Sequence, residues 1–165
     1  MGLFKRASDG IAELVPIPPI ADLPPAKLQA SARYLGTLDA DGRRVIGHSL
    51  SARSAARLSL SAEAIDVVRI AGSFRIRTEA LRGARGDRQF GGKPVPDLLV
   101  IRWQHDGRDW ETGFRLDAAK SVRDVAKAQL GKNTGPAQPE VGAWVRTISK
   151  LVRTNTNGKA GESND

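Results

Sequence analysis

Cationic side chains that could bind an anion are concentrated between residues 75 and 93 of this sequence. Guanidinium groups grip phosphate and carboxylate groups through paired hydrogen bonds. Side chains spaced i, i+2 project from one face of a strand, and nearby glycines add flexible turns. We therefore predict an anion-binding or partner-binding surface made by Arg75, Arg77, Arg82, Arg85, Arg88 and Lys93. The alternative is a solvated strand face whose charges prevent edge-to-edge aggregation.

A second candidate surface lies near the C-terminus. Apolar residues recur at helical spacing from Val141 to Val152, and Trp144 is the largest of them. The other face of this predicted helix carries Arg146, Lys150 and Arg153. An amphipathic basic helix of this kind can lie at a membrane interface or in a partner's groove. It can equally pack back onto its own domain, and the sequence leaves both possibilities open.

The composition gives little support for catalysis or for metal binding. The chain has no cysteine, and its two histidines are His48 and His105, with no carboxylates clustered beside them. His48 stands next to Ser49, but a nucleophile and base also need a third orienting group and an oxyanion site. We predict no catalytic residue, no metal, no cofactor and no small-molecule substrate.

Alternation of apolar and polar residues with a period of two runs from Ser31 to Leu116 and predicts short β-strands. Asp106-Gly107 is a hairpin turn signal, so Trp103 and Trp110 should meet across the two flanking strands. Beyond Leu116 the period changes to 3.6 residues, which predicts one helix near residues 118–131. The pattern indicates a mainly β domain in which antiparallel strands form a barrel or sandwich.

Several short segments carry a resemblance to a known family. They are Ala32–Thr37, Gly47–Leu50 with Ala52–Ser54, and Leu99–Trp103 with Thr112–Arg115. In that order they resemble bacterial proteins with a pleckstrin-homology-like (PH-like) domain, found in actinobacteria. The resemblance implies a barrel of two near-orthogonal antiparallel sheets, capped by a C-terminal α-helix and without enzymatic activity.

Members of that family often carry an N-terminal transmembrane helix, which this sequence lacks. Either this member is soluble, or its true start lies upstream. The lipid-binding basic pair of eukaryotic PH domains is echoed only loosely by Arg43-Arg44, so phosphoinositide binding is not predicted.

These observations divide the chain into a Pro-rich N-terminal arm (1–30), a PH-like barrel with its capping helix (31–131), a linker and amphipathic basic helix (132–153) and a disordered tail (154–165). The net charge of +8 favours anionic partners. We expect a cytoplasmic protein, free or peripheral at the inner membrane face. Its predicted function is non-enzymatic binding or scaffolding through a protein partner or anionic lipid. The alternative is a nucleic-acid-binding domain that uses the basic segment.

Overall fold

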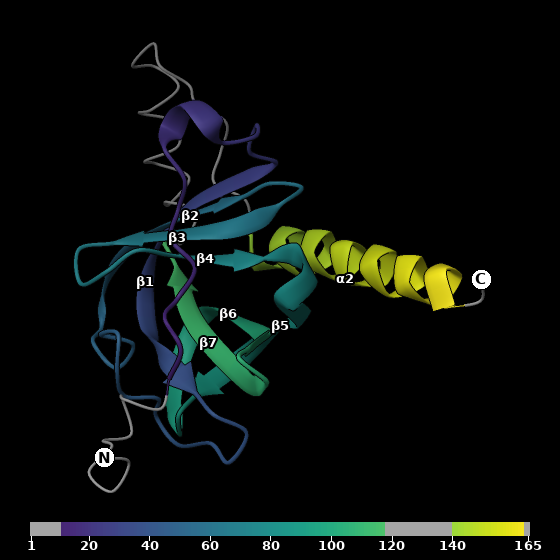
Figure 1. Cartoon of the computed structure of the whole chain (residues 1–165). Helices are drawn as coiled ribbons and strands as arrows, with labels where there is room; N and C mark the ends of the chain where they lie inside the picture. The colour runs from purple at the N-terminus through teal and green to yellow at the C-terminus, as the bar shows by residue number, and fades with distance from the viewer. Residues whose placement is uncertain (1–10, 118–139, 164–165) are drawn as a thin grey trace, which may run out of the picture.

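The structure, a computed structural model, describes residues 11–117 and 140–163 (Figure 1). Within that range it contains seven strands, one α-helix and two single-turn 3-10 helices. The strands are β1 (Leu28–Leu38), β2 (Ser54–Leu60), β3 (Ala64–Arg69), β4 (Phe74–Arg77), β5 (Leu81–Phe90), β6 (Lys93–His105) and β7 (Arg108–Leu116). The helices are η3 (Ile20–Asp22), η4 (Thr78–Ala80) and α2 (Val141–Ser163). The prediction of a mainly β domain is confirmed.

The seven strands form one continuous antiparallel sheet in the order β4-β3-β2-β1-β7-β6-β5. Two near-orthogonal sheets were predicted, but β1 pairs with both β2 and β7 and therefore joins the two halves. A register shift in β1 between Tyr34 and Gly36 accompanies this change of partner. Figure 1 shows β2, β3 and β4 running across the direction of β7, as the strands of a closing barrel do.

The core follows the predicted alternation. Leu58, Leu60, Phe74 and Ile76 are buried, and Trp110, Thr112, Phe114 and Leu116 share the inner face of β7. Trp103 lies opposite Trp110, and the two rings meet edge-to-face with centroids 5.1 Å apart. The predicted hairpin is therefore confirmed, with its turn at Asp106-Gly107 in the left-handed conformation.

A chain of buried hydrogen bonds crosses the middle of this core. Tyr34 donates to the Leu50 carbonyl at 2.6 Å, so its oxygen accepts from Thr37 at 2.7 Å. Thr37 in turn accepts from Thr112 at 2.8 Å, and Thr112 accepts from the indole of Trp103 at 2.9 Å. Each polar group is satisfied by the next, which removes the penalty for burying it.

A smaller apolar cluster covers the outer face of the sheet, made by Leu35, Phe90, Leu98 and Val100. The Phe90 ring lies directly over Gly113, because a Cβ at residue 113 would be 2.8 Å from a ring atom. Glycine at this position thus lets the end of β5 pack flat against β7. Leu98 and Val100 point outward while Leu99 and Ile101 point into the main core, so β6 is buried on both faces.

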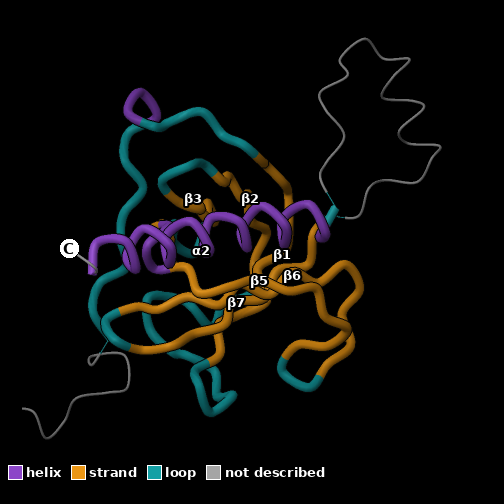
Figure 2. The backbone as a smooth tube through the Cα atoms, turned by 90° about the vertical axis from the view of Figure 1, so that its right-hand side faces the viewer, coloured by secondary structure: helices purple, strands orange, loops and turns teal. Residues whose placement is uncertain are grey.

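Helix α2 lies across β5 and β6 (Figure 2). Trp144 and Ile148 are fully buried in the main core cluster. The side chain of Asn155 donates to the Thr78 carbonyl at 2.8 Å, which ties the helix to η4. The helix continues to Ser163, so residues 154–163, predicted to be a disordered tail, are helical. Extending an anchored helix avoids the cost of nucleating one. The helix predicted near 118–131 lies outside the described residues.

The described part of the N-terminal arm is mostly extended, as its prolines predict, with one turn at η3. The arm ends earlier than predicted, because β1 begins at Leu28. None of the helices in the described ranges is long and apolar enough to cross a membrane.

Candidate binding surfaces

The basic segment does not form one exposed surface. Arg75 was predicted to project with Arg77 into solvent, but only 7% of it is exposed. Its guanidinium donates to both carboxylate oxygens of Asp66, at 2.8 and 3.1 Å, and lies 3.7 Å from Glu63. The hydrogen bond that Arg75 donates to Asp66 raises the pKa of Arg75. The prediction of an exposed Arg75 is therefore wrong, because β3 places a carboxylate directly opposite it.

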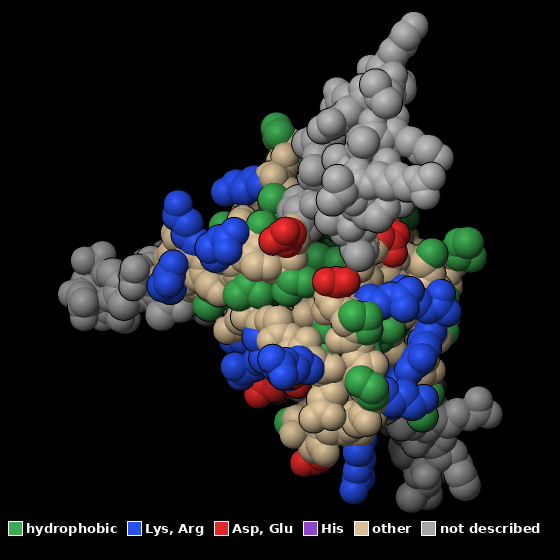
Figure 3. All heavy atoms as spheres, turned by 180° about the vertical axis from the view of Figure 1, so that it is seen from behind, with side chains coloured by type: hydrophobic (Ala, Val, Ile, Leu, Met, Phe, Trp, Pro, Cys, Tyr) green, Lys and Arg blue, Asp and Glu red, His purple; other side chains and the backbone are tan. Residues whose placement is uncertain are grey.

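Arg85 also forms ion pairs with two carboxylates. It donates to Glu111 on β7 and, at 3.1 Å, to Asp87. Arg82 donates to the Glu79 and Leu81 carbonyls and to Gln104. The exposed cations of the segment lie on β4, β5 and β6 and are Arg77, Arg82, Arg88 and Lys93. Figure 3 shows Lys and Arg side chains in separate groups on the face seen from behind. The binding role predicted for these six residues stays a prediction.

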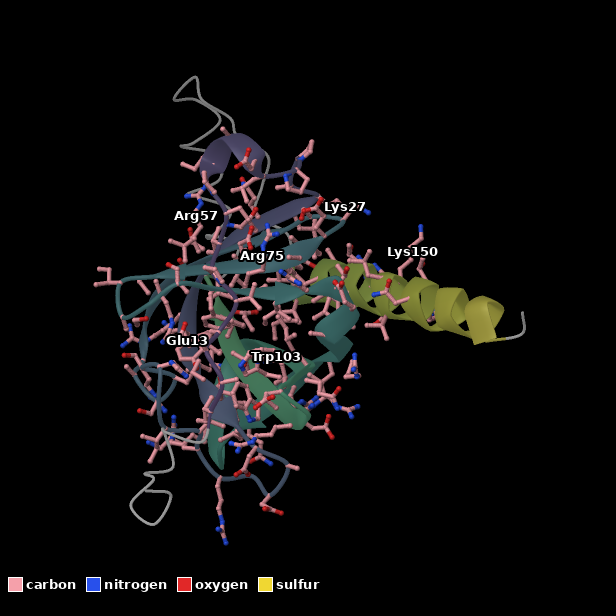
Figure 4. All side chains as sticks on the ribbon, viewed as in Figure 1. Glu13, Lys27, Arg57, Arg75, Trp103 and Lys150 are labelled. Atoms are coloured by element: carbon pink, nitrogen blue, oxygen red, sulfur yellow. The ribbon has the colours of Figure 1, made fainter. Side chains whose placement is uncertain are left out.

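On the second candidate surface, helix α2, the predicted cations are exposed but the predicted aromatic residue is buried. Arg146, Lys150 and Arg153 are exposed on α2, and Figure 4 shows Lys150 pointing away from the barrel. Trp144 is buried on the opposite side of the helix. Of the two possibilities left open, packing onto the domain is the one that the structure adopts. Trp144 therefore has no exposed surface with which to enter a membrane.

Sheet register creates an exposed arginine pair that the sequence reasoning missed. Arg33 on β1 lies directly opposite Arg115 on β7, and both are exposed. Like charges in this position repel each other, which costs stability unless an anion screens them. Alternation alone indicates that each residue faces outward, but only the pairing of β1 with β7 brings them together.

Arg69 organises one end of the barrel. It is 5% exposed and lies over the ring of Tyr34, with 4.4 Å between the guanidinium carbon and the ring centroid. It donates to the carbonyls of His48 and Ser49 at 3.1 and 2.8 Å. Burial lowers the pKa of Arg69. Because Arg69 ends β3, these bonds join the turn between β3 and β4 to the loop between β1 and β2.

Two isoleucines at this end point into solvent, and the sequence reasoning did not single them out. Ile46, in the β1–β2 loop, is 60% exposed, and Ile70, at the tip of the β3–β4 turn, is 100% exposed. Val45 and Leu50 anchor the loop in the core, so Ile46 must face away from it. Along β3 the side chains of Ile65, Val67 and Arg69 face inward. The same alternation directs Val68 and Ile70 outward, and it was the sequence signal for their exposure. Exposed Arg43 and Arg53 belong to the same loop.

Two open grooves flank the N-terminal arm. The larger, of about 500 Å³, lies between the β1–β2 loop and the β6–β7 turn, and Ile11 lines it. The smaller, of about 230 Å³, lies beside β4 and η4, and Val15 lines it together with Arg77 and Arg82. No group of three potential metal ligands occurs among the residues that the structure describes.

A bent seven-stranded antiparallel sheet with a C-terminal helix packed on it is the architecture of a PH-like domain. The chain belongs to the bacterial PH domain-like family, whose model matches residues 12–129. The resemblance seen in the sequence is thereby confirmed. Domains of this class are binding or scaffolding modules and are generally non-catalytic. No curated protein matches the chain in sequence.

Proposed function

We propose that this chain is a PH-like module that attaches peripherally to an anionic membrane surface through the barrel end carrying Ile46 and Ile70. The observation that supports the proposal is that Ile70 is fully exposed and Ile46 largely exposed, in a turn and a loop that the hydrogen bonds from Arg69 to His48 and Ser49 hold together. The β3–β4 turn touches the β1–β2 loop, since a Cβ at Gly72 would be 3.9 Å from the His48 carbonyl oxygen. In Figure 1 the β3–β4 turn lies on the left, and the β1–β2 loop runs from the bottom of the barrel up the left side.

The energetics of such a contact are modest but sufficient for reversible attachment. Burying an isoleucine side chain fully stabilises by about 1.5–3 kcal/mol. Each basic residue near an anionic lipid surface adds about 1 kcal/mol. Arg43 and Arg53 stand in the loop that carries Ile46 and can supply the second contribution. The loop needs little further ordering on binding, because Arg69, Val45 and Leu50 already hold it.

The membrane contact is placed in the loops and not in α2, because Trp144 is buried. An anionic lipid is also favoured over nucleic acid as the binding partner. The exposed large apolar residues of the described ranges are Ile20, Ile46, Val68 and Ile70, and none is aromatic. Stacking with unpaired bases requires exposed aromatic rings.

Vesicle co-sedimentation tests the proposal. Wild-type protein should bind vesicles of phosphatidylcholine with phosphatidylglycerol and should bind pure phosphatidylcholine weakly. Ile70→Ser should reduce binding to the anionic vesicles by about fivefold, because an apolar side chain no longer enters the interface. Ile20→Ser is the matched control, since Ile20 is 88% exposed but stands in η3, far from the loops (Figure 1). Equal losses for the two variants, or no binding by the wild type near physiological salt, would exclude this attachment.

A further inference from the structure

Three hydrogen bonds hold the N-terminal arm along the barrel between residues 11 and 15. His48 Nε2 donates to the Ile11 carbonyl at 3.2 Å, and His105 Nε2 donates to the Ala12 carbonyl at 2.9 Å. The backbone amide of Arg75 donates to the Val15 carbonyl at 2.8 Å. His48 and His105 are the only histidines in the sequence, and both bind this one segment.

All three bonds are made to the main chain of the arm, so they do not depend on its side chains. Val15 forms a one-residue antiparallel bridge with Arg75, which belongs to the edge strand β4. The pairing is antiparallel, so a longer ladder in this register would place Glu13 opposite Arg77. By strand alternation, the amide of Arg77 faces the same open side as that of Arg75. The described part of the arm bridges β4 at Val15 alone, so a partner segment that continues this register could pair with more of β4 than the arm does.

The surroundings of the bridge add room and charge. Ile11 lines the larger groove and Val15 the smaller one, so the held segment spans the distance between the two grooves. The smaller groove carries the exposed cations Arg77 and Arg82 against one acidic residue, Glu79. Figure 4 shows Glu13 below and to the left of Arg75, and Trp103 below Arg75. The exposed cations Arg77 and Arg82 favour a ligand with carboxylates.

We infer that the β4 edge is a docking site for an extended acidic segment of a partner protein, and that residues 11–15 occupy it until the partner displaces them. The partner strand adds to the sheet through main-chain hydrogen bonds, and its carboxylates meet Arg77 and Arg82. The arm then acts as an internal competitor that lowers the apparent affinity. This site is separate from the loop end proposed to contact the membrane.

The test uses full-length protein and a fluorescein-labelled peptide that copies residues 9–17, whose Glu13 would face Arg77 in the register of the Val15–Arg75 bridge. Leu14→Ser in the protein releases the arm by removing its apolar anchor, and it leaves His48, His105 and the β4 edge available to the peptide. Fluorescence anisotropy should show about tenfold tighter binding to this variant than to the wild type, because the competing arm loses the burial of a leucine side chain. Hydrogen exchange at the Arg77 amide should slow when the peptide binds.

Controls separate the docking site from a nonspecific charge effect. Arg77→Glu in the released variant should abolish the tighter binding, whereas Arg57→Glu on β2 should leave it unchanged. The same peptide with Glu13→Lys should bind more weakly, because the lysine would face Arg77. If Leu14→Ser does not fold, Ile11→Ser releases the arm through its other apolar anchor. Equal peptide affinity of wild-type and released proteins would mean that the arm does not compete for the edge, and an unprotected Arg77 amide would mean that the peptide binds elsewhere. Either result overturns the proposal.

Discussion

Arg75 and Asp66 face each other across β4 and β3 as a buried ion pair held by two hydrogen bonds. Arg75 therefore stabilises the fold of the domain. Arg77, two residues later, is the exposed cation of the same strand. A substitution at residue 75 should therefore test folding, and one at residue 77 should test binding.

Arg75→Ala should destabilise the protein by about 3 kcal/mol, because it leaves the Asp66 carboxylate buried without its cation. Arg77→Ala should change the free energy of unfolding by less than about 0.5 kcal/mol, as is usual for exposed residues. Urea unfolding of the two variants, followed by far-ultraviolet circular dichroism, measures both effects. Similar stabilities for the two variants would contradict the structural role of Arg75.

Gly113→Ala should destabilise by about 1–3 kcal/mol, because the new methyl group overlaps the Phe90 ring and forces the outer cluster to repack. Gly83→Ala on β5 is the matched control, since a Cβ there meets no atom within 4 Å. Thermal unfolding of the two variants gives the comparison. Combining Gly113→Ala with Phe90→Ala should cost less than the sum of the single changes, because the clash disappears.

Tyr34 should make the stability of the protein fall at high pH. Burial raises the pKa of this phenol to about 12 from its ordinary value of 10.0. Between these values the unfolded chain releases the proton and the folded protein keeps it, so the free energy of unfolding decreases as pH rises. The loss should approach about 3 kcal/mol above the folded-state pKa, since each unit is worth about 1.4 kcal/mol.

The chain has one tyrosine, so phenolate absorbance reports Tyr34 alone. Its titration in the folded protein should be displaced upward, and it should return to the ordinary value in urea. Tyr34→Phe should remove this part of the pH dependence. Titration of the folded protein near 10 would show that the phenol is open to solvent.

Trp144→Ala should destabilise by about 3–5 kcal/mol, the usual cost of removing a large side chain from a core. Trp144→Phe should cost much less, because the indole Nε1 is buried without a hydrogen-bond partner among the described residues. Chemical denaturation measures both. A Trp144→Ala variant of unchanged stability that fails to bind vesicles would instead favour the membrane-interface interpretation of α2.

Much of the fold could be predicted because its signals are local. Alternation identified the inner faces of β2, β4 and β7, and Asp106-Gly107 located the turn that pairs Trp103 with Trp110. The family resemblance predicted the barrel, whereas the capping helix that it placed near 118–131 lies outside the described residues and the helix packed on the sheet is α2. The end of α2 was misjudged because its later residues have poor helix propensity, and the sequence does not reveal the anchor that Asn155 finds on Thr78.

The binding surfaces were harder to predict because charge exposure depends on register. Sequence spacing placed Arg75 and Arg77 on one strand face, but it could not indicate that Asp66 stands opposite the first of them. The same limit applies to Arg85, whose partner Glu111 is 26 residues away in the chain. It applies again to the arm, where Val15 meets Arg75.

The sequence by itself determined the strand-rich architecture, the inward residues of β2, β4 and β7 and the excess of positive charge, since each follows from residue type and short-range period. It did not predict β5, whose residues 82–86 read as a flexible turn because of their glycines. Tertiary structure decided which cations remain free, which indole is buried and which isoleucines reach solvent. The physical reason is that long-range pairing sets the electrostatic environment of each side chain. A guanidinium opposite a carboxylate, such as Arg75 at Asp66, is neutralised, whereas one opposite its like, such as Arg33 at Arg115, is left exposed.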